Sequence, residues 1–379
     1  MARKTTAVSL IALLLLLTGA AADSRYDALR REAEQFYAEK SFSRAHEVYA
    51  RAAKLELPPA ERRWVRFRLA DTAWRASGAT PEIRAELLAL AQSPERDLVY
   101  AEANESLGDL DHATQHYVAA LDWWAGSSEI PLARQRYLAI VWKMETQSWY
   151  AIPREVLVSA VKIAESTDDR AHARFLLAMH LLQQERYQPA SVERAIELFE
   201  EIIKDGASTE WYDDALYYAA SSTTDYVKAL RYYTILVNRF SRSTSQWHDE
   251  AANAIANITN TSVDVAVGQT FLPESEQELT LSWRNVKQIE LSLHAVDLTG
   301  DFALDDRRQW VDMLPVTGKA VRSWTYETND TGEHRPGSVT LPLSPRLDPG
   351  AYVLLARGGS ASGRALLLVT DAHILVHNG

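Results

Sequence analysis

Two hydrophobic periods divide the chain into a helical region and a β-strand region. Residues 23–260 carry apolar side chains at steps of three and four positions, and alanine, leucine, glutamate and arginine predominate there. This spacing predicts α-helices. From about Val263 the apolar step becomes two, which predicts β-strands. We therefore expect a helical domain over residues 23–260 and a β domain over residues 261–379.

The β region contains several tracts with alternating apolar residues. They are Val263, Val265 and Val267; Leu279, Leu281 and Trp283; Ile289, Leu291 and Leu293; and Tyr352, Leu354 and Ala356. Alternate side chains of a strand point to opposite faces, so each tract predicts one buried face. Glycines and prolines between the tracts indicate turns, at Pro273, Gly318, Gly332, Gly337, Pro345 and Pro349.

The helical region contains an internal repeat. Phe42, Ala45, Tyr49 and Ala52 have counterparts, at a step of 68, in Leu110, Ala113, Tyr117 and Ala120. Val192, Ala195, Phe199 and Ile202 have counterparts, at a step of 34, in Tyr226, Ala229, Tyr233 and Leu236. A step of 34 is typical of paired helices, in which a small alanine allows close approach and an aromatic ring fills the adjacent space.

These repeats resemble the tetratricopeptide family over roughly Asp23 to Ile258, with five to six helix pairs. We expect Gly108 to end the first helix of one pair. The family's usual tryptophan and Leu-Gly pair are mostly replaced. Because the interval from Ala113 to Ala195 is not a multiple of 34, we expect insertions in the middle repeats. The resemblance implies an α-helical solenoid that binds other proteins.

The β region resembles a macroglobulin (MG) domain of bacterial α2-macroglobulin-like proteins. The matching tracts are Phe271–Pro273, Leu279–Val286, Leu291–Leu298, Pro349–Leu354 and Leu368–Asp371. The resemblance implies a seven-stranded Ig-like β-sandwich without catalytic residues, in a family that traps proteases. The reactive thioester of that family requires a cysteine, and this chain has none.

Residues 1–22 have the order of a secretory signal peptide. Arg3 and Lys4 precede an apolar run from Ala7 to Leu17, and small residues lead up to Ala22. We expect cleavage after Ala22 and a periplasmic or secreted protein. The run is shorter than the roughly 20 residues that span a membrane, and no later segment is apolar enough.

Charge and cysteine content exclude some function classes. The formal net charge is −11, and no basic stripe of the kind that binds nucleic acid is present. Without cysteine the chain has neither disulfides nor thiolate metal sites. About 357 residues would remain after cleavage, enough for two or three domains.

Short motifs of catalytic type occur without the partners that they need. Ser159 and Lys162 have the Ser-x-x-Lys spacing, but they lie in a helical segment and lack the motifs that accompany it. The tract Gly359–Gly363 is predicted to be a hairpin loop between two strands. We therefore predict no catalytic residue and no cofactor.

The histidines and acidic loops do not predict a metal site. His112 and His116 are interpreted as part of a solvated helix face, and the pair His373 and His377 as a frayed chain end. An acidic loop matches no calcium motif and is interpreted as solvated, with carboxylates at Asp297, Asp301, Asp305 and Asp306.

Adjacent aromatic residues are the candidate protein-binding positions. The chain has eleven Trp and sixteen Tyr. Neighbours on a helix point about 100° apart, so one member of each adjacent pair should be partly exposed. Exposed aromatic clusters often mark interfaces. The candidates are Trp123, Trp124, Trp211, Tyr212, Tyr217 and Tyr218, and Tyr232-Tyr233 is a further pair.

These observations predict a secreted, non-enzymatic protein-binding scaffold related to the N-terminal part of α2-macroglobulin-like proteins. Its expected partners are other proteins, such as proteases or envelope proteins, and not nucleic acid. Two alternatives stay open. The chain could belong to a protease-trapping macroglobulin that lacks the thioester here, or it could be an envelope enzyme or a cell-wall-associated adaptor.

Overall fold

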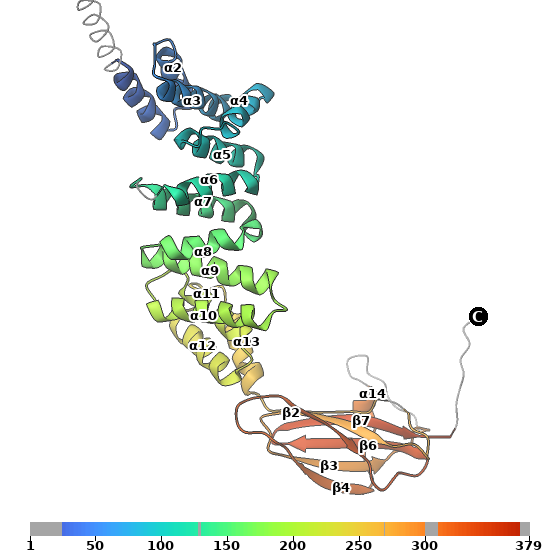
Figure 1. Ribbon diagram of the computed structural model, residues 1–379. Coiled ribbons are helices and arrows are strands. Elements are labelled where there is room, and N and C mark those ends of the chain that lie inside the picture. The colour runs from blue at the N-terminus through green and yellow to red at the C-terminus, as the bar shows by residue number, and fades with distance from the viewer. Residues whose placement is uncertain (1–24, 128–129, 269, 300–309, 372–379) are drawn as a thin grey trace, which may run out of the picture. The chain divides into compact units, whose positions relative to one another are not determined.

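The computed structural model describes residues 25–127, 130–268, 270–299 and 310–371 (Figure 1). The predicted signal peptide lies outside these residues. The chain forms two compact units, Met1–Leu198 and Phe199–Gly379, so the boundary between the units falls within a helix. The predicted division near residue 260 instead marks the change from helix to strand.

The helical region consists of consecutive α-helices, and within each unit neighbouring helices contact one another. It begins with a helix over residues 25–38. The helices that follow are α2 (Phe42–Ala52), α3 (Pro59–Ser77), α4 (Pro81–Ala91), α5 (Leu98–Asp111), α6 (Thr114–Gly126), α7 (Ala133–Ser148), the short η1 (Trp149–Ala151), α8 (Arg154–Ile163), α9 (Thr167–Gln184), α10 (Pro189–Asp205), α11 (Tyr212–Ser222), α12 (Tyr226–Arg239) and α13 (His248–Thr259). Among the described residues these α-helices make six consecutive pairs followed by α13, which agrees with the predicted number.

Most repeat residues pack as their spacing predicts, but Ala113, the counterpart of Ala45, is half-buried and precedes α6 as its N-cap residue. Ala45 and Tyr49 of α2 are fully buried, and so are Ala120 and, to within 1%, Tyr117 of α6. Both helices are second members of their pairs. Side chains at the N-cap position define several helix starts. The Asp97 side chain, for example, accepts a hydrogen bond from the Tyr100 amide (3.0 Å).

Gly108 does not end a helix, contrary to the prediction. It lies inside α5, which continues to Asp111 and is followed by His112 in a left-handed conformation (φ 50°). A Cβ atom at position 108 would come within 2.8 Å of the Tyr117 ring. Glycine is therefore required here for the close approach of α6 and not for a helix end.

The insertion in the array has a definite position. The helices α7 and α9 begin at Ala133 and Thr167, which are one step of 34 apart. The next first helix, α11, begins at Tyr212, at a longer step of 45 from the start of α9. The regular step therefore persists through the middle of the chain, and the extra residues lie between α9 and α11.

The strands form two antiparallel sheets in the second unit. The strands are β1 (Ser262–Ala266), β2 (Glu278–Arg284), β3 (Gln288–Ala295), β4 (Arg322–Glu327), β5 (Gly337–Pro342), β6 (Gly350–Gly358) and β7 (Ala361–Val369), with the short helix α14 (Trp310–Met313) before β4. One sheet has the order β1-β2-β5 and the other β4-β3-β6-β7. Buried residues of both sheets share one hydrophobic core.

The predicted alternation is confirmed in this core. The alternating residues of β2 and β3 are all at most 4% exposed, and those of β6 at most 8%. The strand at Val263 ends at Ala266, just before Val267. Gly337 is not a turn residue but the start of β5, where a Cβ atom would lie 2.3 Å from the Trp283 ring. Of the predicted hairpin loop Gly359–Gly363, only Gly359 and Ser360 form the turn, and Ala361–Gly363 already belong to β7.

Candidate functional site: a charge ladder on the first helices

A network of charged side chains crosses four successive first helices of the first unit. We call it the charge ladder. It comprises Glu34 from the helix over residues 25–38, Arg68, Asp71 and Arg75 from α3, Glu102, Glu105 and Asp109 from α5, and Arg136 and Lys143 from α7. Two series at steps of 34 alternate in sign, namely Glu34, Arg68, Glu102 and Arg136, and Arg75, Asp109 and Lys143, whereas Asp71 and Glu105, also 34 apart, are both acidic.

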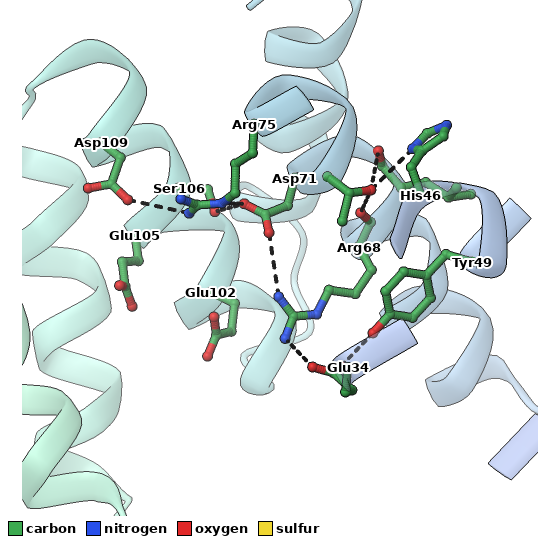
Figure 2. Close-up of polar contacts among 12 residues, drawn as sticks. Glu34, His46, Tyr49, Arg68, Asp71, Arg75, Glu102, Glu105, Ser106 and Asp109 are labelled. Atoms are coloured by element: carbon green, nitrogen blue, oxygen red, sulfur yellow. Dashed lines mark hydrogen bonds and ion pairs between the residues drawn. The ribbon is translucent and has the colours of Figure 1, made fainter. Parts of the chain in front are cut away.

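Asp71 is the centre of the network. Its side chain is fully buried and accepts hydrogen bonds from Arg75 Nε (2.8 Å), Ser106 Oγ (3.1 Å) and Arg68 Nη1 (3.4 Å). Figure 2 shows Asp71 between the two arginines. A buried carboxylate is costly unless it is paired and hydrogen-bonded, and here each oxygen has a cationic donor.

Arg68 connects Asp71 to the preceding repeat. Its Nη2 donates to Glu34 Oε2 at 3.0 Å, and the Tyr49 hydroxyl donates to the same carboxylate (Figure 2). The guanidinium lies 4.1 Å from the centre of the Tyr37 ring and 4.7 Å from that of Trp64. These aromatic faces compensate part of the hydration that the buried cation loses.

The helices α5 and α7 are joined by the same kind of contact. Arg136 Nη2 lies 2.7 Å from Glu102 Oε1 and 3.2 Å from Glu105 Oε2. Lys143 Nζ donates to Glu105 Oε1 at 2.9 Å and to Asp109 Oδ2 at 3.1 Å. Because Arg75 Nη2 is 3.5 Å from the same Asp109 oxygen, the network continues from α3 to α7.

Burial and neighbouring charge shift the pKa values of these groups. Burial raises the pKa of Glu102, although Arg136 opposes the shift, and the Glu105 carboxylate adds to it. Burial by itself would lower the pKa of Lys143, but the carboxylates of Glu105 and Asp109 outweigh it and raise that pKa. Burial also raises the pKa of the Tyr37 hydroxyl.

The ladder can fix the positions of neighbouring repeats. It contains five acidic and four basic side chains that pair mainly with one another across repeat boundaries. Removing one partner of a buried pair would leave the other charge buried and unpaired, so such a change should disturb the stacking of the repeats. Arg136 and Lys143 keep about a third of their side-chain surface exposed.

The six predicted aromatic candidates do not gather at one site. Trp124 is buried, 5.7 Å from the Arg136 guanidinium, whereas Trp123 is half-buried and donates to the Arg96 carbonyl (2.9 Å). Trp211 is half-buried and Tyr212 buried. These two pairs each have one partly exposed member, as the helical spacing predicts. Their role in binding stays a prediction.

The remaining candidates belong to an aromatic cluster in the second unit. We define it as Phe199, Tyr217, Tyr218, Tyr233 and Trp247. Tyr217 stacks on Trp247 with ring centres 4.1 Å apart and planes 12° apart. The indole of Trp247 also donates to Asp214 Oδ1 at 2.7 Å. Both Tyr217 and Tyr218 are half-buried.

The prediction of one exposed member is wrong for Tyr232 and Tyr233. Both residues are buried, at 8% and 6% exposure. Tyr233 contacts the ring of Tyr217, whereas the Tyr232 hydroxyl donates to Glu200 at 3.0 Å. Neighbouring helices cover both side chains. The spacing of residues along one helix cannot predict this.

His112 and His116 do not form part of one solvated helix face, contrary to the interpretation of the sequence. His112 follows the end of α5 in a left-handed conformation, so it shares no helix face with His116. His116 is half-buried, with its Nδ1 3.2 Å from Asn104 Oδ1, and burial lowers its pKa. Asp297 is exposed, and the other acidic-loop residues and the pair His373 and His377 lie outside the described residues.

The described part of the chain offers neither a metal centre nor a membrane span. Within it, no group of three or more His, Asp or Glu side chains is placed to hold a metal ion. In the same residues no helix combines the length and apolar character needed to cross a membrane.

The sequence patterns that we considered do not identify the charge ladder, although its signal is present. Glu34, Arg68, Glu102 and Arg136 stand at exact multiples of 34 and alternate in sign. A search for periodic hydrophobic residues does not detect charged residues. A comparison of charges at equivalent repeat positions would have found them.

Solved structures of other proteins are similar to part of the chain. No protein-family model and no curated protein matches the chain. One similar solved structure comes from a functional characterization of pilF from Pseudomonas aeruginosa, with 14% identity, 62% of this chain and 99% of that chain covered, and a TM-score of 0.36. Another is a Rap protein complexed with competence and sporulation factor, with 12% identity, coverage of 62% and 70%, and a TM-score of 0.28.

Both TM-scores lie below 0.5, so neither likeness carries an argument. The tetratricopeptide-like character of the array rests instead on its own helix pairs, its step of 34 and its buried alanines and aromatics. The chain is thus a tetratricopeptide-like helical array followed by antiparallel β-sheets.

Proposed function

We propose that this protein is a non-enzymatic scaffold that binds other proteins. The observation that carries the proposal is the charge ladder, whose ion pairs cross the repeat boundaries from Glu34 to Lys143. A scaffold must hold distant surface positions in a constant geometry, and stacked repeats tied by buried ion pairs do so. Such preorganisation lowers the entropy cost of binding.

Chemical cross-linking in cells that produce the protein tests this proposal. The chain is tagged, cross-linked in the intact cell and purified under denaturing conditions. We expect one or a few proteins to be attached at constant stoichiometry, and fewer of them when Asp71→Ala disrupts the ladder. The exposed Asp122→Ala is the matched control. Turnover of a substrate by the purified chain, with no attached protein, would contradict the scaffold.

The β region is proposed to be a macroglobulin-type domain. Seven strands in two antiparallel sheets around one core, among the described residues, are compatible with the seven-stranded Ig-like sandwich that the sequence resemblance implies. The second candidate function follows from this. The chain would be the N-terminal module of a protease-trapping protein without a thioester.

The size of the native protein separates the two candidates. An antibody raised against residues 23–379 is used to blot an envelope extract. A band near the mass calculated for this chain favours a separate scaffold. A band several times larger favours the macroglobulin, and the protein is then tested for the ability to shield a protease from a large inhibitor.

Secretion is part of the proposal and rests on the leader at residues 1–22. N-terminal sequencing of the protein from a periplasmic or culture fraction should give Asp23 as the first residue. A start at Met1, or recovery from the cytoplasm alone, would exclude the proposed localisation.

A further inference from the structure

The first unit has a second concave surface, which does not involve the charge ladder. We call it the α3 groove. It encloses about 460 Å³ between α3, the segment after α2 and α4. Its apolar lining residues are Ala53, Leu55, Leu57, Val65, Leu69, Ala70, Ala73 and Ile83. At about 100° per residue, the α3 residues of the groove lie on the side of the helix opposite Arg68, Asp71 and Arg75.

The shape of the floor matches a helix. On α3 the lining residues run from Arg62 to Ala73 at helical spacing, and at about 1.5 Å per residue they span about 16 Å, or three turns. The small side chains of Ala70 and Ala73 allow another backbone to approach closely. Leu55 and Ile83, both half-buried, offer apolar contacts from either side.

The two ends of the groove carry opposite charges. Arg63 Nη2 donates to the Leu90 carbonyl at 3.2 Å and Arg66 pairs with Glu86, so α3 and α4 are antiparallel. Arg62 therefore lies at one end of the groove and Glu82 toward the other. Arg62 and Arg66 lie on α3, and Glu82 and Glu86 lie on α4. Arg66 and Glu86 neutralise each other, with Nη2 2.9 Å from Oε2. Within the described residues neither Arg62 nor Glu82 forms an ion pair. Arg62 donates to the Leu57 carbonyl at 3.0 Å, and both side chains are exposed.

We propose that the α3 groove binds an amphipathic α-helix of a partner protein. The helix places its apolar side on Leu69, Ala73 and Ile83, with an acidic end toward Arg62 and a basic end toward Glu82. This is the helix-in-groove mode of recognition, in which apolar anchors recur at three- and four-residue steps. The inference rests on the proposed scaffold function and assigns it a surface and a ligand class.

Three synthetic helical peptides of equal length, each of about four turns, test the groove. They share one leucine face and differ in the charged residues at their two ends: glutamate at one end and lysine at the other, glutamate at both, or lysine at both. Fluorescence anisotropy with the purified chain measures their affinities. We expect the mixed peptide to bind up to about fivefold more tightly than either other peptide, because each of the others lacks one exposed ion pair, worth about 0.2–1 kcal/mol. Equal affinities, or no binding, would overturn the proposal.

Charge reversal in the protein makes the test specific. Glu82→Arg should shift the preference to the peptide with glutamate at both ends, and Arg62→Glu to the peptide with lysine at both ends. Ala73→Arg, which fills the floor, should weaken all three at least tenfold, whereas Ala89→Arg on the exposed surface of α4 should not. Circular dichroism checks that each variant is folded. An unchanged preference in the charge variants contradicts the assigned site.

Failure of this inference can be told apart from failure of the scaffold. If Ala73→Arg leaves the pattern of proteins cross-linked in cells unchanged, the groove is not the docking surface, yet the scaffold function stands. If the wild-type chain cross-links no protein, the scaffold itself fails.

Discussion

The two units hold successive first helices together with different chemistry. In the first unit, α3, α5 and α7 are joined by ion pairs around the fully buried Asp71. In the second unit, α11 meets the start of α13 through Tyr217 stacked on Trp247, and the Trp247 indole donates to Asp214. Successive first helices can therefore be joined either by ion pairs or by stacked aromatic rings. The two kinds of contact differ in how they should respond to deletion, salt and pH.

The largest expected effect is the loss of Asp71. Asp71→Ala leaves Arg68 and Arg75 without their shared carboxylate, so the free energy of opening should fall by about 3–5 kcal/mol. Hydrogen exchange of the α3 and α5 amides in the full chain measures it. Asp122→Ala, an exposed carboxylate of α6, is the control. A loss no larger than that of the control would mean that the ladder does not hold the first unit together.

The corresponding deletion in the second unit is Trp247→Ala. It removes the ring stacked on Tyr217 and the indole donor to Asp214, whose pKa burial already raises. Because Trp247 is only half-buried, we expect a loss of about 2–3 kcal/mol, below the range for buried tryptophan. Exchange of the α11 and α13 amides measures the loss. Tyr187→Ala, at an exposed loop position, should change stability by less than about 0.5 kcal/mol.

High salt should destabilise the first unit and leave the stability of the second unit unchanged. At 1 M NaCl the screening length is about 3 Å, so the partly exposed pairs of Arg136 and Lys143 should weaken by a total of about 1 kcal/mol. The stacked rings carry no charge and should be unaffected. Exchange rates of α7 and α11 amides at low and high salt provide the comparison. Equal responses would remove the proposed distinction between the units.

The smallest expected effect is the titration of Lys143. Its pKa is raised in the folded chain, so its stabilising contribution is fully present below the unfolded lysine pKa of about 10.4. The contribution is lost as the pH rises through the higher folded value. At pH 8, Lys143→Gln should therefore cost about 0.5–1 kcal/mol, and the difference from wild type should shrink above about pH 10.5. A constant difference across this range would contradict the assignment.

The helical and strand regions could be predicted because their signal is local. The alternation at Leu279, Leu281 and Trp283 identified β2, and the alanine–aromatic spacing at Ala45 and Tyr49 identified a second helix. Prediction failed where one residue type serves two purposes. Glycine at positions 108 and 337 was interpreted as a break, yet in both places it makes room for an aromatic ring from another segment.

The candidate site was less predictable than the fold. Aromatic pairs were chosen for their hydrophobic character, and Tyr232 and Tyr233 are both covered by neighbours that their own helix cannot specify. The charge ladder was missed, because charged residues at helical spacing are usually solvated. Asp71 has nothing in its local sequence that distinguishes it from an exposed carboxylate.

The sequence by itself determined the order of helices and strands, the step of 34 and the alternating charges at that step. These follow from periods along a single chain. Only the tertiary structure decided which side chains are buried, which charges meet and where the groove lies beside α3. Burial and ion pairing depend on segments that are distant in the sequence, such as those that contain Glu34 and Arg68. No local pattern predicts how close two such segments lie in space.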